Sequence, residues 1–203
     1  MNQTRIKRDL DWLAEKDFEL RRGIEQVGYP LPRIREPGFG TLLSTIVSQQ
    51  ISTEAAAAIT QRVRALLPQM DPVALLQLPA QALREAGLSQ RKVEYAESLA
   101  RAFVDKSFDP AALNDMSDEE ALKMITSLRG FGRWSAEIYL MFSLQRADIF
   151  PAGDLAVRVG LQKLRGLDEP LNEVQARELT ASWAPCRSAG SLFLWHYYRG
   201  APG

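Results

Sequence analysis

The sequence predicts an all-α protein. Along most of the 203 residues, apolar side chains recur every three or four positions, which is the spacing of amphipathic helices. No stretch alternates apolar and polar residues as a half-buried strand does, and proline and glycine stand mainly between the periodic segments. These observations favour helices joined by short turns.

The expected helices follow in chain order. Leu10, Leu13, Leu20 and Ile24 predict a first helix over residues 9–27, which is broken by the prolines that follow. Polar caps and proline at helix starts, and glycine at helix ends, bound most of the others. We expect these over residues 39–51, 54–67, a short helix from 72, 79–87, a long helix after 89, a pair on either side of 130, then 155–164, 173–183 and 187–198.

The composition limits the chemistry. Hydrophobic residues make up 46% and charged residues 25% of the chain, which indicates a globular protein. One cysteine, Cys186, excludes a disulfide framework and an iron–sulfur cluster held by four thiolates, and one histidine, His196, excludes a histidine-cluster zinc site. The formal net charge of zero disfavours a strongly basic DNA binder but leaves room for a local basic face.

The sequence also suggests a location. No apolar run approaches the roughly 18 residues of a membrane span. The N-terminus, Met1-Asn2-Gln3-Thr4-Arg5, lacks the apolar core of a signal peptide. We therefore expect no membrane partner and a location in the cytoplasm with the nucleoid. We also expect the protein to be a monomer.

The most specific local pattern is Leu-Arg-Gly-Phe-Gly-Arg-Trp-Ser-Ala over residues 128–136. Ser117 and Glu120 predict a capping box that opens the preceding helix, and Gly130 is expected to end it in the left-handed conformation. Gly132 would let another backbone approach closely. Free N–H groups at the start of a helix from Arg133 would then bind an anion such as a phosphodiester. A plain helix hairpin with a glycine C-cap is the alternative.

A single carboxylate follows at a fixed distance. Asp154 ends the sequence Phe-Pro-Ala-Gly-Asp, 22 residues after Gly132, and precedes an apolar helix. Aspartate is a common N-cap, so capping alone could explain it. The two roles are compatible, because backbone N–H groups hold a capping carboxylate ionised and rigid.

The hairpin and Asp154 together resemble the helix-hairpin-helix–Gly/Pro–Asp superfamily of DNA glycosylases, over about residues 40–200. The resemblance is closest to the 3-methyladenine DNA glycosylase II branch, in a short form without an N-terminal β domain. It implies two helical subdomains, residues 1–38 with 137–203 and residues 39–136. The active cleft would lie between them, with Asp154 at its lip.

The resemblance further implies a monofunctional DNA glycosylase of base excision repair. Such an enzyme flips alkylated purines such as 3-methyladenine out of duplex DNA and hydrolyses their N-glycosidic bond. Asp154 would stabilise the oxocarbenium-like transition state and orient water. Bifunctional relatives have a nucleophilic lysine where this chain has Trp134, so no lyase activity is expected. No cofactor is required, although backbone carbonyls of Leu128 and Phe131 could hold a monovalent cation.

Further site residues are carried over from the resemblance. A cationic base suits an aromatic pocket, for which Trp134, Trp195 and Ile138 are the candidates. Gln50, beside Gln49, matches the wedge that fills the gap left by the flipped nucleotide. The candidates for the DNA backbone are Gly130, Phe131, Gly132, Arg133 and Ser135, with Ser89, Arg91 and Lys92 from a weak second hairpin.

Each of these assignments has a structural alternative. The tryptophans could pack in the core, the glutamines could cap a helix end, and the second hairpin could be an ordinary helical corner. At the level of the whole protein, the alternatives are a glycosylase for uracil or a deaminated purine and a noncatalytic DNA-binding protein. Asp154 separates the classes, because a pure binder has no use for a carboxylate beside the scissile sugar.

Overall fold

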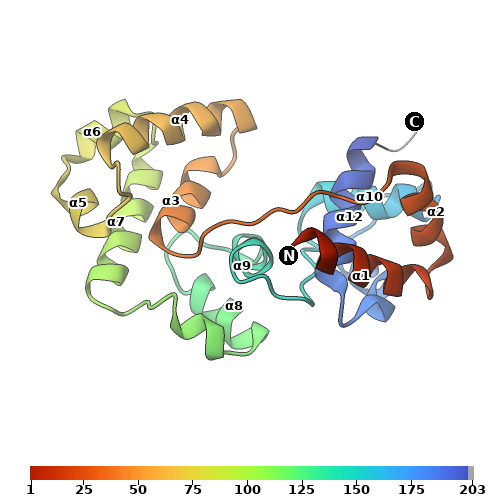
Figure 1. The fold of residues 1–203 in the computed structure, drawn as a ribbon. Coiled ribbons are helices and arrows are strands. Elements are labelled where there is room, and N and C mark those ends of the chain that lie inside the picture. The colour runs from red at the N-terminus through yellow and green to blue at the C-terminus, as the bar shows by residue number, and fades with distance from the viewer. Residues whose placement is uncertain (201–203) are drawn as a thin grey trace. The chain divides into compact units, whose positions relative to one another are not determined.

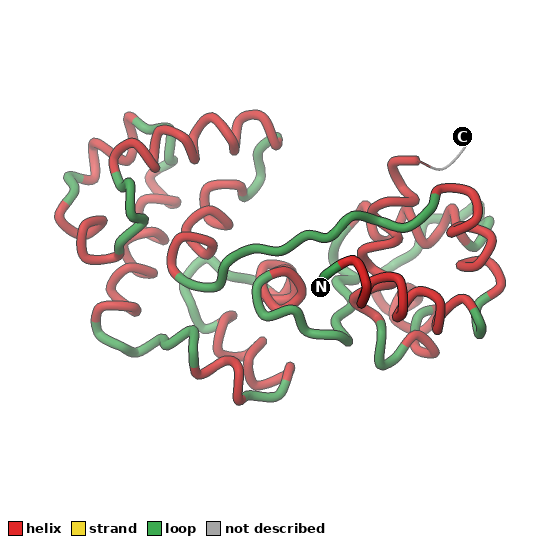
Figure 2. Tube along the Cα trace, viewed as in Figure 1, coloured by secondary structure: helices red, strands yellow, loops and turns green. Residues whose placement is uncertain are grey.

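The computed structural model describes residues 1–200. Within that range the chain forms twelve α-helices and two short 3-10 helices, and no strand (Figures 1 and 2). The all-α prediction is confirmed. No helix in the described part is both long enough and apolar enough to cross a membrane.

The chain divides into two compact units. Unit 1 contains Met1–Ile34 and the chain from Leu140 onward, and unit 2 contains Arg35–Tyr139. The sequence prediction placed these boundaries after residues 38 and 136. The second boundary falls inside α9 (Arg133–Phe142), so this helix contributes to both units.

Unit 1 is built around its last helix. The helices of unit 1 are α1 (Gln3–Ala14), α2 (Phe18–Val27), α10 (Leu155–Leu164), α11 (Glu173–Leu179), the 3-10 helix η2 (Ala181–Trp183) and α12 (Arg187–Gly200). Most of α12 is buried, and α1, α2 and α10 all pack against it. A Cβ at Gly160 would lie 2.5 Å from the carbonyl oxygen of Leu194, so glycine is needed where α10 crosses α12.

The predicted helix over residues 9–27 is wrong as a single element. The chain forms two helices there, although Leu10, Leu13, Leu20 and Ile24 are buried as the pattern suggested. The break is at Asp17, whose carboxylate accepts the N–H of Leu20 and starts α2 as its N-cap. Apolar periodicity continues across the break, and therefore did not reveal it.

Two further helix ends differ from the prediction. The helix expected over residues 173–183 ends at Leu179, beyond which the Thr180 hydroxyl bonds to the carbonyl of Ala176 and the chain tightens into η2. The helix expected over residues 39–51 ends at Ser48. At both places the apolar pattern continues beyond the last helical residue. Hydrogen bonds between residues close in sequence replace the regular helical bonds there.

Unit 2 is arranged around α7 (Gln90–Val104), against which α3, α5 and α6 pack. The other elements of unit 2 are α3 (Phe39–Ser48), α4 (Thr53–Leu66), α5 (Pro72–Gln77), α6 (Ala80–Glu85), the 3-10 helix η1 (Ala112–Asp115) and α8 (Asp118–Thr126). The ring of Phe103 on α7 contacts Phe39 at 5.3 Å and Phe108 at 5.5 Å between centroids. This aromatic cluster fixes α3 on α7.

Asp17 links three parts of unit 1. Besides capping α2, its carboxylate binds the Arg165 guanidinium at 2.8 and 2.5 Å and accepts the indole N–H of Trp183 at 2.7 Å. The side chains of Asp17 and Arg165 are only 6% and 14% exposed. Removing one partner of such a pair leaves a charge in a buried place.

We expect Asp17→Asn to lower the free energy of unfolding by roughly 3 kcal/mol, because Arg165 loses its buried counter-charge. The matched control is Glu19→Gln, since Glu19 also binds Arg165 but its side chain is 51% exposed. This control should cost less than about 1 kcal/mol. Urea unfolding at neutral pH measures both; equal losses would contradict the assignment.

The same interaction predicts a pH dependence. Burial raises the pKa of Asp17, but hydrogen bonds from Arg165, the Leu20 N–H and Trp183 outweigh it and hold the pKa below its ordinary value. A carboxylate with a lowered folded-state pKa stabilises fully above its unfolded pKa of about 3.9 and loses that contribution as the pH falls through the folded value. The difference between wild type and Asp17→Asn should therefore narrow below about pH 4.

Candidate functional site

The hairpin begins as the sequence suggested and ends differently. Ser117 and Glu120 form the predicted capping box at the start of α8. The helix ends at Thr126, before Gly130. The Ser127 N–H makes the last regular bond, to the Lys123 carbonyl four residues back, and the Leu128 N–H bonds instead to the Ile125 carbonyl three residues back. Residues 127–130 therefore form turns, and Gly130 does not cap α8 directly.

Gly130 is required by the protein's own packing. Its φ of +92° lies in the left-handed region, and a Cβ there would lie 2.4 Å from the ring of Tyr95 on α7. The Gln49 side-chain amide donates to the Gly130 carbonyl at 2.8 Å, and Arg129 binds Glu94 on α7 at 2.8 Å. The hairpin loop is thus held against α7 and the end of α3.

Gly132 behaves differently. A Cβ at this position would meet no other described atom within 4 Å, so the predicted close approach of another backbone is not made by the chain itself. The first hydrogen bond of α9 runs from the Ala136 N–H to the Gly132 carbonyl. The amides of residues 133–135 precede that bond and lie at the positive end of the helix dipole.

The side chains at the start of α9 divide into exposed and buried groups. Arg133 is exposed and binds Glu137 at 2.9 Å, while the Glu137 side chain is 3% exposed. Ser135 is buried, so any contact that it makes with DNA would involve its backbone. Trp134 is 40% exposed, which is unusual for an indole, and Ile138, one turn later, is buried.

The second, weaker hairpin also has a helix–turn–helix form. Between α6 and α7, Gly87 adopts a φ of +109°, and Ser89 caps α7 by accepting the N–H of Lys92. The Lys92 ammonium donates to the Val47 carbonyl at 2.7 Å, and burial lowers the pKa of this amine. Arg91 is exposed. The Lys92 ammonium thus binds a backbone carbonyl at the C-terminal end of α3.

The turn after α3 presents Gln50 to solvent. Gln50 is exposed and adopts a φ of +57°, which costs a residue with a side chain about 1 kcal/mol. Ser52 then caps α4. The neighbouring Gln49 is instead turned onto the hairpin loop.

Asp154 is the N-cap of α10, as its sequence position suggested. Its Oδ1 atom accepts the Val157 N–H and the Trp195 indole N–H, each at 3.1 Å. Two arginines hold the loop before it: Arg158 donates to the Ala152 carbonyl at 2.6 Å, and Arg177 donates to the Phe150 carbonyl at 3.0 Å. The backbone just before Asp154 is therefore held in place by hydrogen bonds from these two arginines.

The sequence does not predict the hydrogen bonds that hold Asp154 and the loop before it. The sequence pattern predicts a base-pocket role for Trp195 rather than a contact with Asp154, and it predicts no role for Arg158 or Arg177. One signal is present in the sequence: Ser188, Ser191 and Trp195 place polar groups along one side of the largely buried helix α12. Buried polar groups need hydrogen-bond partners, so such a row indicates a neighbouring irregular segment.

No group of three or more histidine, cysteine, aspartate and glutamate side chains suited to a metal ion occurs among the described residues. The candidate chemistry thus rests on the carboxylate of Asp154 in unit 1 and the helix N-terminus at Arg133 in unit 2.

A helix-hairpin-helix followed by a buttressed aspartate defines a class of DNA-repair protein. Residues 43–185 match the HhH-GPD superfamily base excision DNA repair proteins, and the chain belongs to this family.

Individual relatives agree with the family. DNA-3-methyladenine glycosylase 1 of Schizosaccharomyces pombe is 30% identical over 191 residues, which are 90% of this chain and 83% of that protein. The S. pombe 3-methyladenine DNA glycosylase in complex with abasic DNA has a TM-score of 0.84 at 27% identity, covering 93% of this chain and 95% of that one. DNA-3-methyladenine glycosidase from Bacillus halodurans has a TM-score of 0.84 at 32% identity, covering 94% and 88%. Some curated relatives are longer, and the chain spans 58% and 48% of two of them.

The contrast between the two hairpin glycines gives a test of DNA binding. Gly132→Asp should weaken duplex DNA binding about tenfold or more, because a carboxylate would stand at the anion site at the start of α9. Fluorescence anisotropy measures the Kd, and the thermal midpoint should stay unchanged because the position is open.

Gly132→Ala is the control, and its affinity should remain within a few-fold of wild type. Gly130→Ala should instead lower the thermal midpoint, because it strains the backbone and meets Tyr95. Unchanged affinity in Gly132→Asp would contradict the anion site.

Proposed function

We propose that the protein is a monofunctional DNA glycosylase of base excision repair that releases alkylated purines such as 3-methyladenine from duplex DNA. The observation that carries the proposal is the carboxylate of Asp154 at the start of α10. It accepts hydrogen bonds from the Val157 N–H and from the Trp195 indole N–H of α12. The relatives described above from Schizosaccharomyces pombe and Bacillus halodurans are named as 3-methyladenine glycosylases, which supports the substrate class. A noncatalytic DNA binder would not need this carboxylate.

The proposed reaction is hydrolysis. As the base leaves, positive charge develops on the deoxyribose, and a preorganised carboxylate stabilises it without having to reorient. The same carboxylate orients the attacking water. Alkylation at a ring nitrogen makes the purine cationic and a good leaving group, so little general-acid help is required.

The proposed substrate contacts come from unit 2. The amides at the start of α9, with Arg133, take a backbone phosphate, and Trp134 offers its exposed indole face to the cationic base, beside Ile138. Gln50 is the proposed wedge. The common active cleft inferred from the family resemblance stays a prediction, as do a monomeric state and a location with the nucleoid.

No cofactor is part of the proposal. A monovalent cation at the hairpin would be held by the carbonyl oxygens of Leu128 and Phe131. The Leu128 oxygen already accepts the Phe131 N–H at 3.0 Å, and a carbonyl oxygen has a second lone pair for an ion. Such an ion would supply positive charge near the phosphate.

The first test compares wild type with Asp154→Asn in single-turnover release of free base from methylated duplex DNA. Wild type should release 3-methyladenine or 7-methylguanine, and the variant should be slower by on the order of a hundredfold or more. Asparagine also caps helices, so folding and DNA affinity should be retained. Full activity in the variant would sink the mechanism. No release by either, with DNA bound, would favour another lesion first and a noncatalytic binder second.

A second test concerns the nucleophile. Borohydride added during turnover traps Schiff-base intermediates, which form on amines. Because Trp134 stands where bifunctional relatives have lysine, we expect no covalent protein–DNA adduct on a denaturing gel. A trapped adduct would show that an amine of this chain attacks the sugar, and would contradict the monofunctional assignment.

A further inference from the structure

Trp195 bonds to the proposed catalytic carboxylate. Its indole N–H donates to Asp154 Oδ1 at 3.1 Å, and the side chain is buried, with 8% exposed. An indole N–H can only donate, so the carboxylate oxygen is the acceptor in this bond. The bond joins α12 to the start of α10, near the close crossing of the two helices: Trp195 follows Leu194 directly, and Asp154 lies six residues before Gly160.

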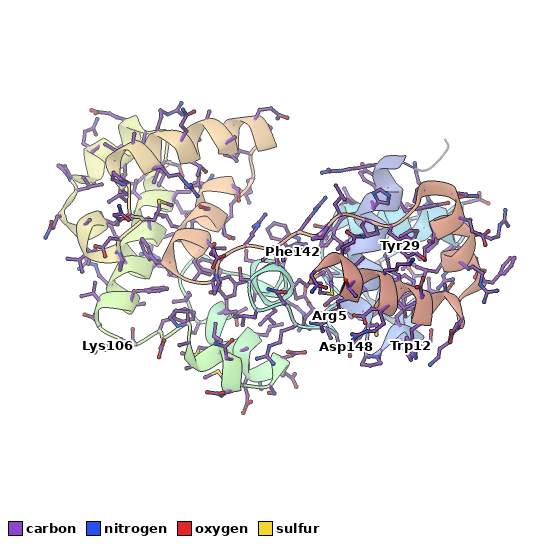
Figure 3. The ribbon with its side chains drawn as sticks, in the orientation of Figure 1. Arg5, Trp12, Tyr29, Lys106, Phe142 and Asp148 are labelled. Atoms are coloured by element: carbon purple, nitrogen blue, oxygen red, sulfur yellow. The ribbon has the colours of Figure 1, made fainter. Side chains whose placement is uncertain are left out.

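The faces of the Trp195 ring are also in contact with the protein. Phe142 lies against the ring at 5.6 Å between centroids with an interplanar angle of 39°. The Arg33 guanidinium lies over the ring at 5.9 Å from its centroid. Phe142 is labelled in Figure 3. A ring with these neighbours and so little exposed surface is held in one orientation, and it offers little area for stacking on a base.

Trp195 is the last in a row of α12 residues that contact the loop over residues 147–154, which ends at Asp154. At the start of α12, the Arg187 guanidinium binds Asp148 at 2.7 and 2.6 Å and holds the pKa of that carboxyl below its usual range. The Ser188 N–H donates to the Ala147 carbonyl at 2.9 Å. Asp148 is labelled in Figure 3. The first part of the loop is therefore aligned along α12.

The next residues of the loop are held in the same way. The Ile149 N–H donates to the Ser188 hydroxyl at 3.0 Å. The Ser191 hydroxyl lies 3.3 Å from the Ile149 carbonyl and 2.8 Å from the Arg187 carbonyl, so its proton is shared between the loop and α12. Ser191 and Trp195 are one helical turn apart, so the contacts continue along one side of α12 toward Asp154. Ser188, Ser191 and Trp195 are all buried.

We infer that Trp195 is a positioning residue, which fixes the rotamer of Asp154 through its indole N–H so that the carboxylate faces the reacting sugar. This inference rests on the proposed glycosylase function. The Val157 N–H binds the same oxygen but comes from the helix that Asp154 itself caps. The indole adds an anchor from a different element, so Oδ1 is held from both α10 and α12.

The test uses Trp195→Phe, which removes the N–H and keeps an aromatic ring. Single-turnover release of 7-methylguanine should slow roughly 10- to 100-fold, because a hydrogen bond to a charged group is lost. The Kd for duplex DNA with an abasic-site analogue should stay within about twofold, and the thermal midpoint should show a folded protein. Trp12→Phe is the matched control, since Trp12 lies on α1 under the Lys16 ammonium.

A role in base stacking would give another result. Phenylalanine still stacks on a base, so release within about threefold of wild type would overturn the inference and leave the proposed function intact. A slow rate accompanied by an equally large loss of DNA affinity would also overturn it. Absence of base release by wild type would contradict the proposed function instead.

A second measurement does not depend on activity. The chain has four tryptophans, and the Trp195 indole proton is identified by its loss from the nuclear magnetic resonance spectrum of Trp195→Phe. In Asp154→Asn this resonance should move upfield, because a neutral acceptor replaces a charged one, while those of Trp12 and Trp183 stay in place. An unmoved Trp195 resonance would overturn the inference even if the enzyme has no detectable turnover.

Discussion

The alignment of the loop over residues 147–154 along α12 is the constraint on which the chemistry of unit 1 depends. The loop has no regular hydrogen-bond ladder, so each of its polar groups must find a partner elsewhere. Arg187, Ser188 and Ser191 supply such partners, and the Trp195 indole N–H donates to the carboxylate of Asp154 at the end of the loop. A rigid helix thereby sets the position of Asp154 far more narrowly than the loop could by itself.

The position of α12 is in turn set by packing. Its middle is buried against α1, α2 and α10, and Gly160 brings α10 within backbone contact of Leu194. The Asp17–Arg165–Trp183 cluster secures the surrounding segments from another side. The core of unit 1 thus holds the carboxylate in a fixed orientation, so the proposed reaction would need no reorganisation of this group.

The hairpin shows how a nearly neutral protein can bind a polyanion. The chain has 25 basic and 25 acidic residues, and the exposed Arg133 is itself paired with Glu137. The anion site proposed here depends on backbone amides and the dipole of α9, whose strength does not depend on net charge. Gly130 shapes the loop by packing under Tyr95, and Gly132 leaves its outer side open to a ligand.

The sequence by itself determined the helical class, the capping box at Ser117, the N-cap role of Asp154 and the family, because these follow from local spacing and from short motifs. It did not determine the break at Asp17 or the early end of α8, since apolar periodicity continues through both. The contacts of Tyr95 with Gly130, of Lys92 with Val47 and of Trp195 with Asp154 were decided only by the tertiary structure. They join residues that are 35 to 45 positions apart, and no local pattern encodes which side chains meet across such distances; the packing of whole helices does.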